Sequence, residues 1–139
     1  MDENLENVLY HAEKMFIENN GMPPVIFMRL KNKMDLFTEF LDLNTKESTL
    51  EVNSRFKKMI ESGELQQYIF ISDIYKGSGE FLLVVIKANI TEEIQCVCDV
   101  KVEDSQYHFG KWNYYDSTEV LAKKNSFNNL FGQVYSRFN

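Results

Sequence analysis

Four apolar-rich segments follow one another within residues 65–115, and they read LQQYIFISDIY, EFLLVVIKANI, IQCVCDVKVED and YHFGKWNYY. They are rich in β-branched and aromatic residues, which is typical of β-strands. Residues 81–86 are six apolar residues in a row, too few for a helix and suited to a strand that is covered on both faces. Short polar breaks at 76–79, 89–93 and 103–106 predict tight turns. The pattern therefore predicts an antiparallel meander with 81–86 in its central strand.

Alternation within these segments predicts which side chains share a face of the sheet. In the first segment one face holds Tyr68, Phe70, Ser72 and Ile74, and the other holds Ile69, Ile71, Asp73 and Tyr75. In the last segment one face holds Tyr107, Phe109 and Tyr115, and the other holds His108, Trp112 and Tyr114. So many aromatic residues on an edge strand indicate either packing beneath the final helix or a recognition surface, and both interpretations stay open.

Helical spacing marks three further segments. The first helix is predicted over residues 3–20, with an apolar stripe of Leu5, Val8, Leu9, Ala12, Met15 and Phe16. The second is predicted over 49–62, where Ser48 to Glu51 spells a capping box. The third is predicted over 126–137, although Gly132 weakens it by about 1 kcal/mol relative to alanine. Between the first two helices, 25–30 and 34–43 form a predicted hairpin.

These elements predict an α+β fold with an antiparallel sheet of about six strands, in two hairpin-linked groups, and helices packed against it. The expected order is α-β-β-α-β-β-β-β-α. A chain of 139 residues with 44% hydrophobic residues is long enough to bury one core. We therefore expect residues 1–139 to form a single globular domain.

Charge and cysteine content narrow the function classes. The formal net charge is −6 and the pI is about 5.0, which argues against binding to nucleic acid or to an anionic membrane through a basic surface. The chain begins with acidic residues in place of a signal peptide, so we expect a cytoplasmic protein. Cys96 and Cys98 could be half of a metal site or a redox pair, or two small buried apolar residues. We favour the buried residues and expect no metal and no cofactor.

The search for catalytic sequence motifs leaves one candidate group of residues. Phosphate-loop, zinc-type and serine-nucleophile motifs are absent from the sequence. Asp73, Tyr75, Glu80 and His108 could meet at one end of the sheet, where a carboxylate beside a histidine would support acid–base chemistry. The candidate catalytic residues are therefore Asp73, Glu80 and His108.

The order of the predicted elements is similar to that of a known group of proteins. Residues 71–75 read ISDIY and close a predicted strand, and with the helix, hairpin, helix and meander order this resembles small uncharacterised α+β proteins of bacteria and phages. The resemblance covers residues 5–115 and supports the fold. It implies no activity, and Asp73 and Tyr75 stand where that spelling has glutamate and tryptophan.

Together these observations lead us to expect a non-enzymatic protein-binding module, an acidic adaptor, inhibitor or immunity-like protein of a bacterium or phage. A central strand that is apolar on both faces needs cover on both, so we expect a homodimer or a protein partner. Tyr75, Trp112 and Tyr114 are the candidate binding residues. The alternative is a small enzyme or ligand-binding domain that uses the carboxylate and histidine cluster.

Overall fold

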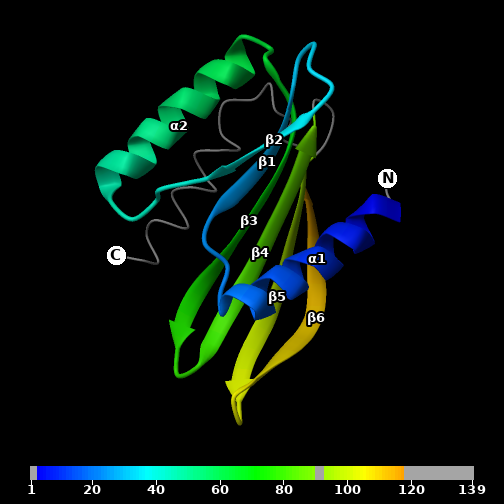
Figure 1. Ribbon diagram of the computed structural model, residues 1–139, viewed down its shortest axis with the longest axis vertical. Coiled ribbons are helices and arrows are strands. Elements are labelled where there is room, and N and C mark those ends of the chain that lie inside the picture. Colours follow the sequence, from blue (N-terminus) through cyan, green and yellow to red (C-terminus); the bar gives the residue numbers. More distant parts are fainter. Residues whose placement is uncertain (1–2, 90–92, 118–139) are drawn as a thin grey trace.

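The computed structural model describes residues 3–89 and 93–117. These residues form two helices and six strands in the expected order (Figure 1): α1 Glu3–Asn19, β1 Val25–Leu30, β2 Leu36–Phe40, α2 Lys46–Glu61, β3 Leu65–Gly77, β4 Glu80–Asn89, β5 Glu93–Glu103 and β6 Gln106–Ser117. The α+β prediction is confirmed. The helix predicted over 126–137 lies outside the described residues.

The six strands form one antiparallel sheet in the order β2-β1-β3-β4-β5-β6. Its centre is the predicted strand, because Val85 of β4 pairs with Ile71 of β3 on one side and with Cys96 of β5 on the other. Residues 83–86 of β4 are all buried. The central position of β4 explains its uninterrupted apolar run, since both of its faces are covered.

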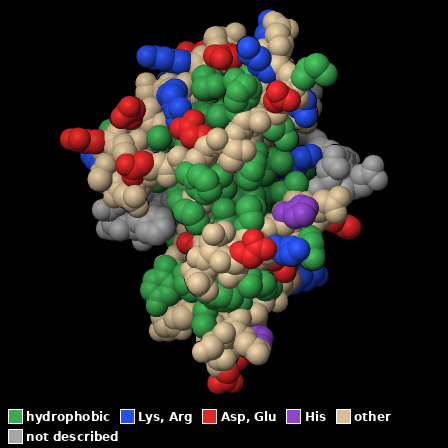
Figure 2. Space-filling model, in the orientation of Figure 1, with side chains coloured by type: hydrophobic (Ala, Val, Ile, Leu, Met, Phe, Trp, Pro, Cys, Tyr) green, Lys and Arg blue, Asp and Glu red, His purple; other side chains and the backbone are tan. Residues whose placement is uncertain are grey.

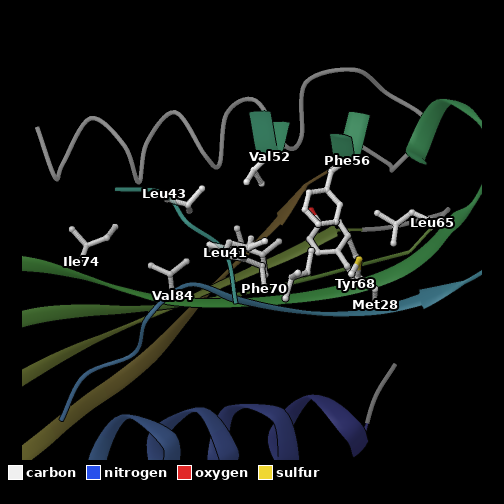
Figure 3. Packing of buried hydrophobic residues seen from close by; sticks show 13 residues of the cluster. Met28, Leu41, Leu43, Val52, Phe56, Leu65, Tyr68, Phe70, Ile74 and Val84 are labelled. Carbon is white, nitrogen blue, oxygen red and sulfur yellow. The ribbon is translucent and has the colours of Figure 1, made fainter. Parts of the chain in front are cut away.

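One described helix lies on each face of the sheet, so the molecule has three layers (Figure 1). On one face α2 lays Val52 and Phe56 onto Tyr68 and Phe70 of β3 (Figure 3). An ion pair between Arg55 and Glu39 holds α2 near the β2 edge. This helix therefore covers the half of its face that is formed by β2, β1 and β3.

On the opposite face α1 is anchored near the other edge. The ring of Phe16 makes edge-on contacts with Tyr107 and Phe109 of β6, at centroid distances of 5.0 and 5.9 Å. The indole nitrogen of Trp112 donates a hydrogen bond to Glu13 at 2.8 Å. Tyr107, Phe109 and Trp112 of β6 therefore pack against α1; the final helix, which the packing interpretation placed over them, lies outside the described residues. The two helices lie over diagonally opposite halves of the sheet.

A β-bulge changes the predicted faces of β6. Cys98 pairs with Trp112, while Val100 pairs with Phe109, so one residue of β5 stands opposite two of β6. This extra residue brings Trp112 and Tyr114 to the same face as Phe109. The prediction that they lie on the opposite face was wrong, because strict alternation holds only where the register is continuous.

The helix α2 begins earlier than its sequence signal suggested. Its N-cap is Thr45, whose hydroxyl oxygen accepts a hydrogen bond from the backbone nitrogen of Ser48 at 3.0 Å, and the backbone nitrogen of Thr45 donates to the Ser48 hydroxyl at 3.2 Å. Ser48 is therefore the third helical residue and not the N-cap. The earlier start places Thr49 and Val52 on the buried side of the helix.

Candidate functional site

The three candidate catalytic residues do not converge. Asp73 pairs with Leu83, which belongs to the apolar cluster beneath α1. Glu80 of β4 and His108 of β6 both pair with Lys101 of β5, which lies between them. Glu80 precedes Phe81, which also packs in the α1 cluster. Because neighbouring residues of a strand point to opposite faces, Glu80 and His108 project from the α2 side of the sheet while Asp73 projects from the α1 side.

Asp73 has a structural role. Its carboxylate accepts a hydrogen bond from the backbone nitrogen of Met22, and its own backbone nitrogen donates to the Met22 carbonyl at 3.0 Å. Burial raises the pKa of Asp73, and the Met22 hydrogen bond opposes that shift. Gly21 has φ +139°, and a Cβ there would stand 3.2 Å from the Asp73 carboxylate. Asp73 therefore fastens the segment after α1 to β3.

The candidate binding residues lie apart on the α1 face. Tyr75 is exposed and stacks at a tilt on Phe81, 5.0 Å between centroids. Tyr114 is also exposed but pairs with Cys96, at the level of Val85 on β4. Trp112 lies between β6 and α1 as described above. The three residues do not form one continuous surface.

The cysteines behave as buried apolar residues. Cys96 and Cys98 form no disulfide and are completely buried, and the thiol of Cys98 donates to the carbonyl of Gly110 at 3.3 Å. Burial, with a smaller contribution from the charge of Glu13, raises the pKa of Cys98 to about 11, so the thiol stays protonated at neutral pH. Among the described residues, no group of three or more His, Cys, Asp and Glu could hold a metal ion.

The most distinctive surface feature is an apolar groove on the half of the sheet that α1 leaves open. Figure 2 shows apolar side chains gathered in the middle of this face. The groove has a volume of about 330 Å³ and is lined by Val8, His11, Met15, Phe27, Leu36, Ile69 and Ile71. We call it the α1 groove. One wall comes from α1, the floor from β1 and β3, and the outer edge from β2.

Sheet width explains the α1 groove. Adjacent strands are about 4.8 Å apart, so six strands span about 24 Å, whereas a helix with its side chains is about 10 Å wide. One helix can cover only about half of such a face. Because α1 is held toward β6, the cross-strand pair of Phe27 and Ile69 is left partly exposed. Two apolar residues of β2 that are also on this face, Leu36 and Phe40, are 57% and 69% exposed.

The outer edge of the groove is basic. A smaller hollow of about 60 Å³ shares Phe27, Leu36 and Ile69 with the α1 groove and adds Arg29 to its lining. Arg29 belongs to the β1–β2 hairpin, whose turn exposes Lys31 and Lys33 as well. Arg29 therefore lies beside the groove, and Lys31 and Lys33 follow it in the same hairpin, in a chain whose net charge is −6.

The sequence did not reveal this groove, although one signal was present. Segment 34–43 was predicted as one long strand with an apolar face. Only residues 36–40 form β2, and this edge strand is exposed along most of its length. Apolar residues on an edge strand would have been the signal for an open surface.

Comparison of the chain with protein-family models, with curated proteins and with solved structures gave no match. Neither helix in the described part of the chain is long and apolar enough to cross a membrane.

Proposed function

We propose that this protein is a non-enzymatic protein-binding module, an adaptor, inhibitor or immunity-like protein, that binds its partner through the α1 groove. The observation that carries the proposal is the apolar lining of the α1 groove. Apolar surfaces of this kind on soluble domains commonly mark sites of protein contact. The two buried cysteines, which form no disulfide, are consistent with a reducing compartment, so we propose a cytoplasmic location.

Energetics favour an occupied groove. Full burial of a leucine or phenylalanine side chain contributes about 1.5–3 kcal/mol. Leu36 is 57% exposed, so its burial alone would contribute about 1 kcal/mol. Phe27, Ile69 and Phe40 add to this from neighbouring positions on the same face. Catalysis by Asp73, Glu80 and His108 receives no comparable support, because Asp73 points to the opposite face from Glu80 and His108, and Lys101 stands between those two.

The proposal is tested by capture of partners from a lysate of the native host with two matched variants. Leu36→Glu places a charge at the groove edge, and Leu50→Glu places one on α2. Leu50 is the matched control because it is also 57% exposed. We expect a protein that is retained by the wild type and by Leu50→Glu to be lost with Leu36→Glu. Equal retention by both variants would contradict the groove as the binding surface.

Self-association is measured in the same series. Sedimentation of the purified protein at micromolar concentration distinguishes a monomer from a dimer. If the protein is a dimer that Leu36→Glu dissociates, the partner is a second copy of this chain. If it is a monomer, the groove is available to a different protein.

A further inference from the structure

The shape of the α1 groove selects among possible occupants. Its floor, formed by β1 and β3, and its outer edge, formed by β2, together are about 10 Å wide from β3 to β2, at about 4.8 Å per strand. A helix is about 10 Å in diameter, and packed helices lie 8–10 Å apart. A single helix fits beside α1 on this floor. An extended peptide would add to the free edge of β2 and leave Phe27 and Ile69 uncovered.

The wall provided by α1 also has helical spacing. Val8 and Met15 both line the groove and are seven residues apart, so they lie two turns apart, about 10 Å along the helix axis. His11 lies between them. A partner helix with apolar residues at i, i+3 or i+4, and i+7 would meet this wall at each turn. The groove thus matches two to three turns of an amphipathic helix.

Charge indicates the orientation of that helix. The β1–β2 hairpin beside the groove carries Arg29, Lys31 and Lys33; its two acids are Asp35 and Glu39, and Glu39 is paired with Arg55 of α2. The residues with which α1 lines the groove, Val8, His11 and Met15, include no acid and no lysine or arginine. Acids on the outer flank of a partner helix would therefore find their counter-charges in the cations of the hairpin.

We infer that the α1 groove binds an amphipathic α-helix of a partner protein, with its apolar stripe on Phe27, Ile69 and Leu36 and an acidic flank toward the β1–β2 hairpin. This inference rests on the proposed function and adds the chemical nature of the partner. The described part of the chain would then hold two helices side by side on this face, α1 and the helix of the partner.

The test uses two phage-displayed libraries as probes. One displays a stable helical scaffold randomised on a single face, and the other displays linear peptides of the same length. Both are selected against the full-length protein. We expect binders from the helical library, with an apolar stripe and glutamate or aspartate enriched on one flank. Enrichment from the linear library alone, or failure of the helical library to yield a binder, would overturn the inference.

Two pairs of variants then locate the selected binder. Leu36→Glu should weaken its binding about tenfold, which corresponds to about 1.4 kcal/mol, and Leu50→Glu should leave it unchanged. Replacing Lys31 and Lys33 together by glutamate should weaken binding of the selected binder by a similar factor. A second binder, in which lysines replace the acids of the flank, should restore the affinity for this variant. The matched control reverses Lys57 and Lys58, two exposed cations of α2.

The outcomes separate this inference from the proposed function. A helical binder that is insensitive to Leu36→Glu contradicts the inference. A second outcome is that a native partner is captured in a Leu36-dependent way while only linear peptides are selected from the libraries. This result supports the proposed binding function, but it indicates that the partner binds as an added strand and contradicts the inference. A dimer that dissociates with Leu36→Glu makes the occupant a second copy and also contradicts the inference.

Discussion

Phe16 is the residue whose loss should most directly test how α1 is held. It is completely buried and its ring makes edge-on contacts with Phe81, Tyr107 and Phe109 at 5.4, 5.0 and 5.9 Å. Truncation of a buried phenylalanine to alanine costs about 3–5 kcal/mol. Each aromatic pair contributes about 0.5–1.5 kcal/mol beyond its buried area. We therefore expect Phe16→Ala to lower the free energy of unfolding by at least about 3 kcal/mol.

Urea denaturation measures this change, and hydrogen exchange shows where it acts. A loss of about 3 kcal/mol should lower Tm by roughly 10 °C in a domain of this size. Amides of α1 should lose protection before those of β4, because the sheet keeps its own pairing. Tyr10→Ala is the control on the same helix, since Tyr10 is 58% exposed, and should change stability by less than about 0.5 kcal/mol. A cost below about 1 kcal/mol for Phe16→Ala would refute the anchoring of α1 on β6.

Three further predictions follow from single side chains. Thr45→Ala should cost about 1 kcal/mol through loss of the N-cap, whereas Thr45→Ser should cost much less; equal losses in urea denaturation would contradict the cap. The thiols of Cys96 and Cys98 should react with a maleimide at neutral pH only after unfolding, because both are buried and the pKa of Cys98 is raised to about 11; stoichiometric labelling of the native protein would show otherwise. Burial raises the pKa of Asp73 above its usual 3.8, so the folded state holds this proton more tightly and the free energy of unfolding should fall as pH rises through that range. Asp73→Asn should remove this part of the pH dependence. An unchanged slope of the free energy of unfolding against pH in this variant would contradict the assignment to Asp73.

The elements of the fold could be predicted because their signals are local. The apolar run at 81–86 identified β4 as a strand covered on both faces, and the alternation in β3 gave the correct face for Tyr68 and Asp73. The pairing of β1 with β3 could not be predicted in the same way. It joins Val25 to Ile71 across more than forty residues, and no periodicity within either strand identifies the partner.

Errors arose where a local pattern had two solutions. Both Thr45 and Ser48 can serve as an N-cap; Thr45 is the cap, and Thr49 and Val52 are buried in the helix that follows it. In β6 the register shifts between the pairs Cys98–Trp112 and Val100–Phe109, where Gly110 lies against the backbone of Asp99. Tertiary contacts decided both cases.

The same contacts determine where the groove lies. The aromatic residues of β6 were expected to include a recognition surface, but Tyr107, Phe109 and Trp112 pack beneath α1. By holding α1 near β6, they leave Phe27 of β1 and Ile69 of β3 partly exposed on this face, because one helix is narrower than six strands. In the proposed function the aromatic residues would therefore act on recognition indirectly, through the position of α1. A change that moved α1 toward β1 would close the groove and expose the aromatic residues of β6, so the two surfaces cannot both be open at once.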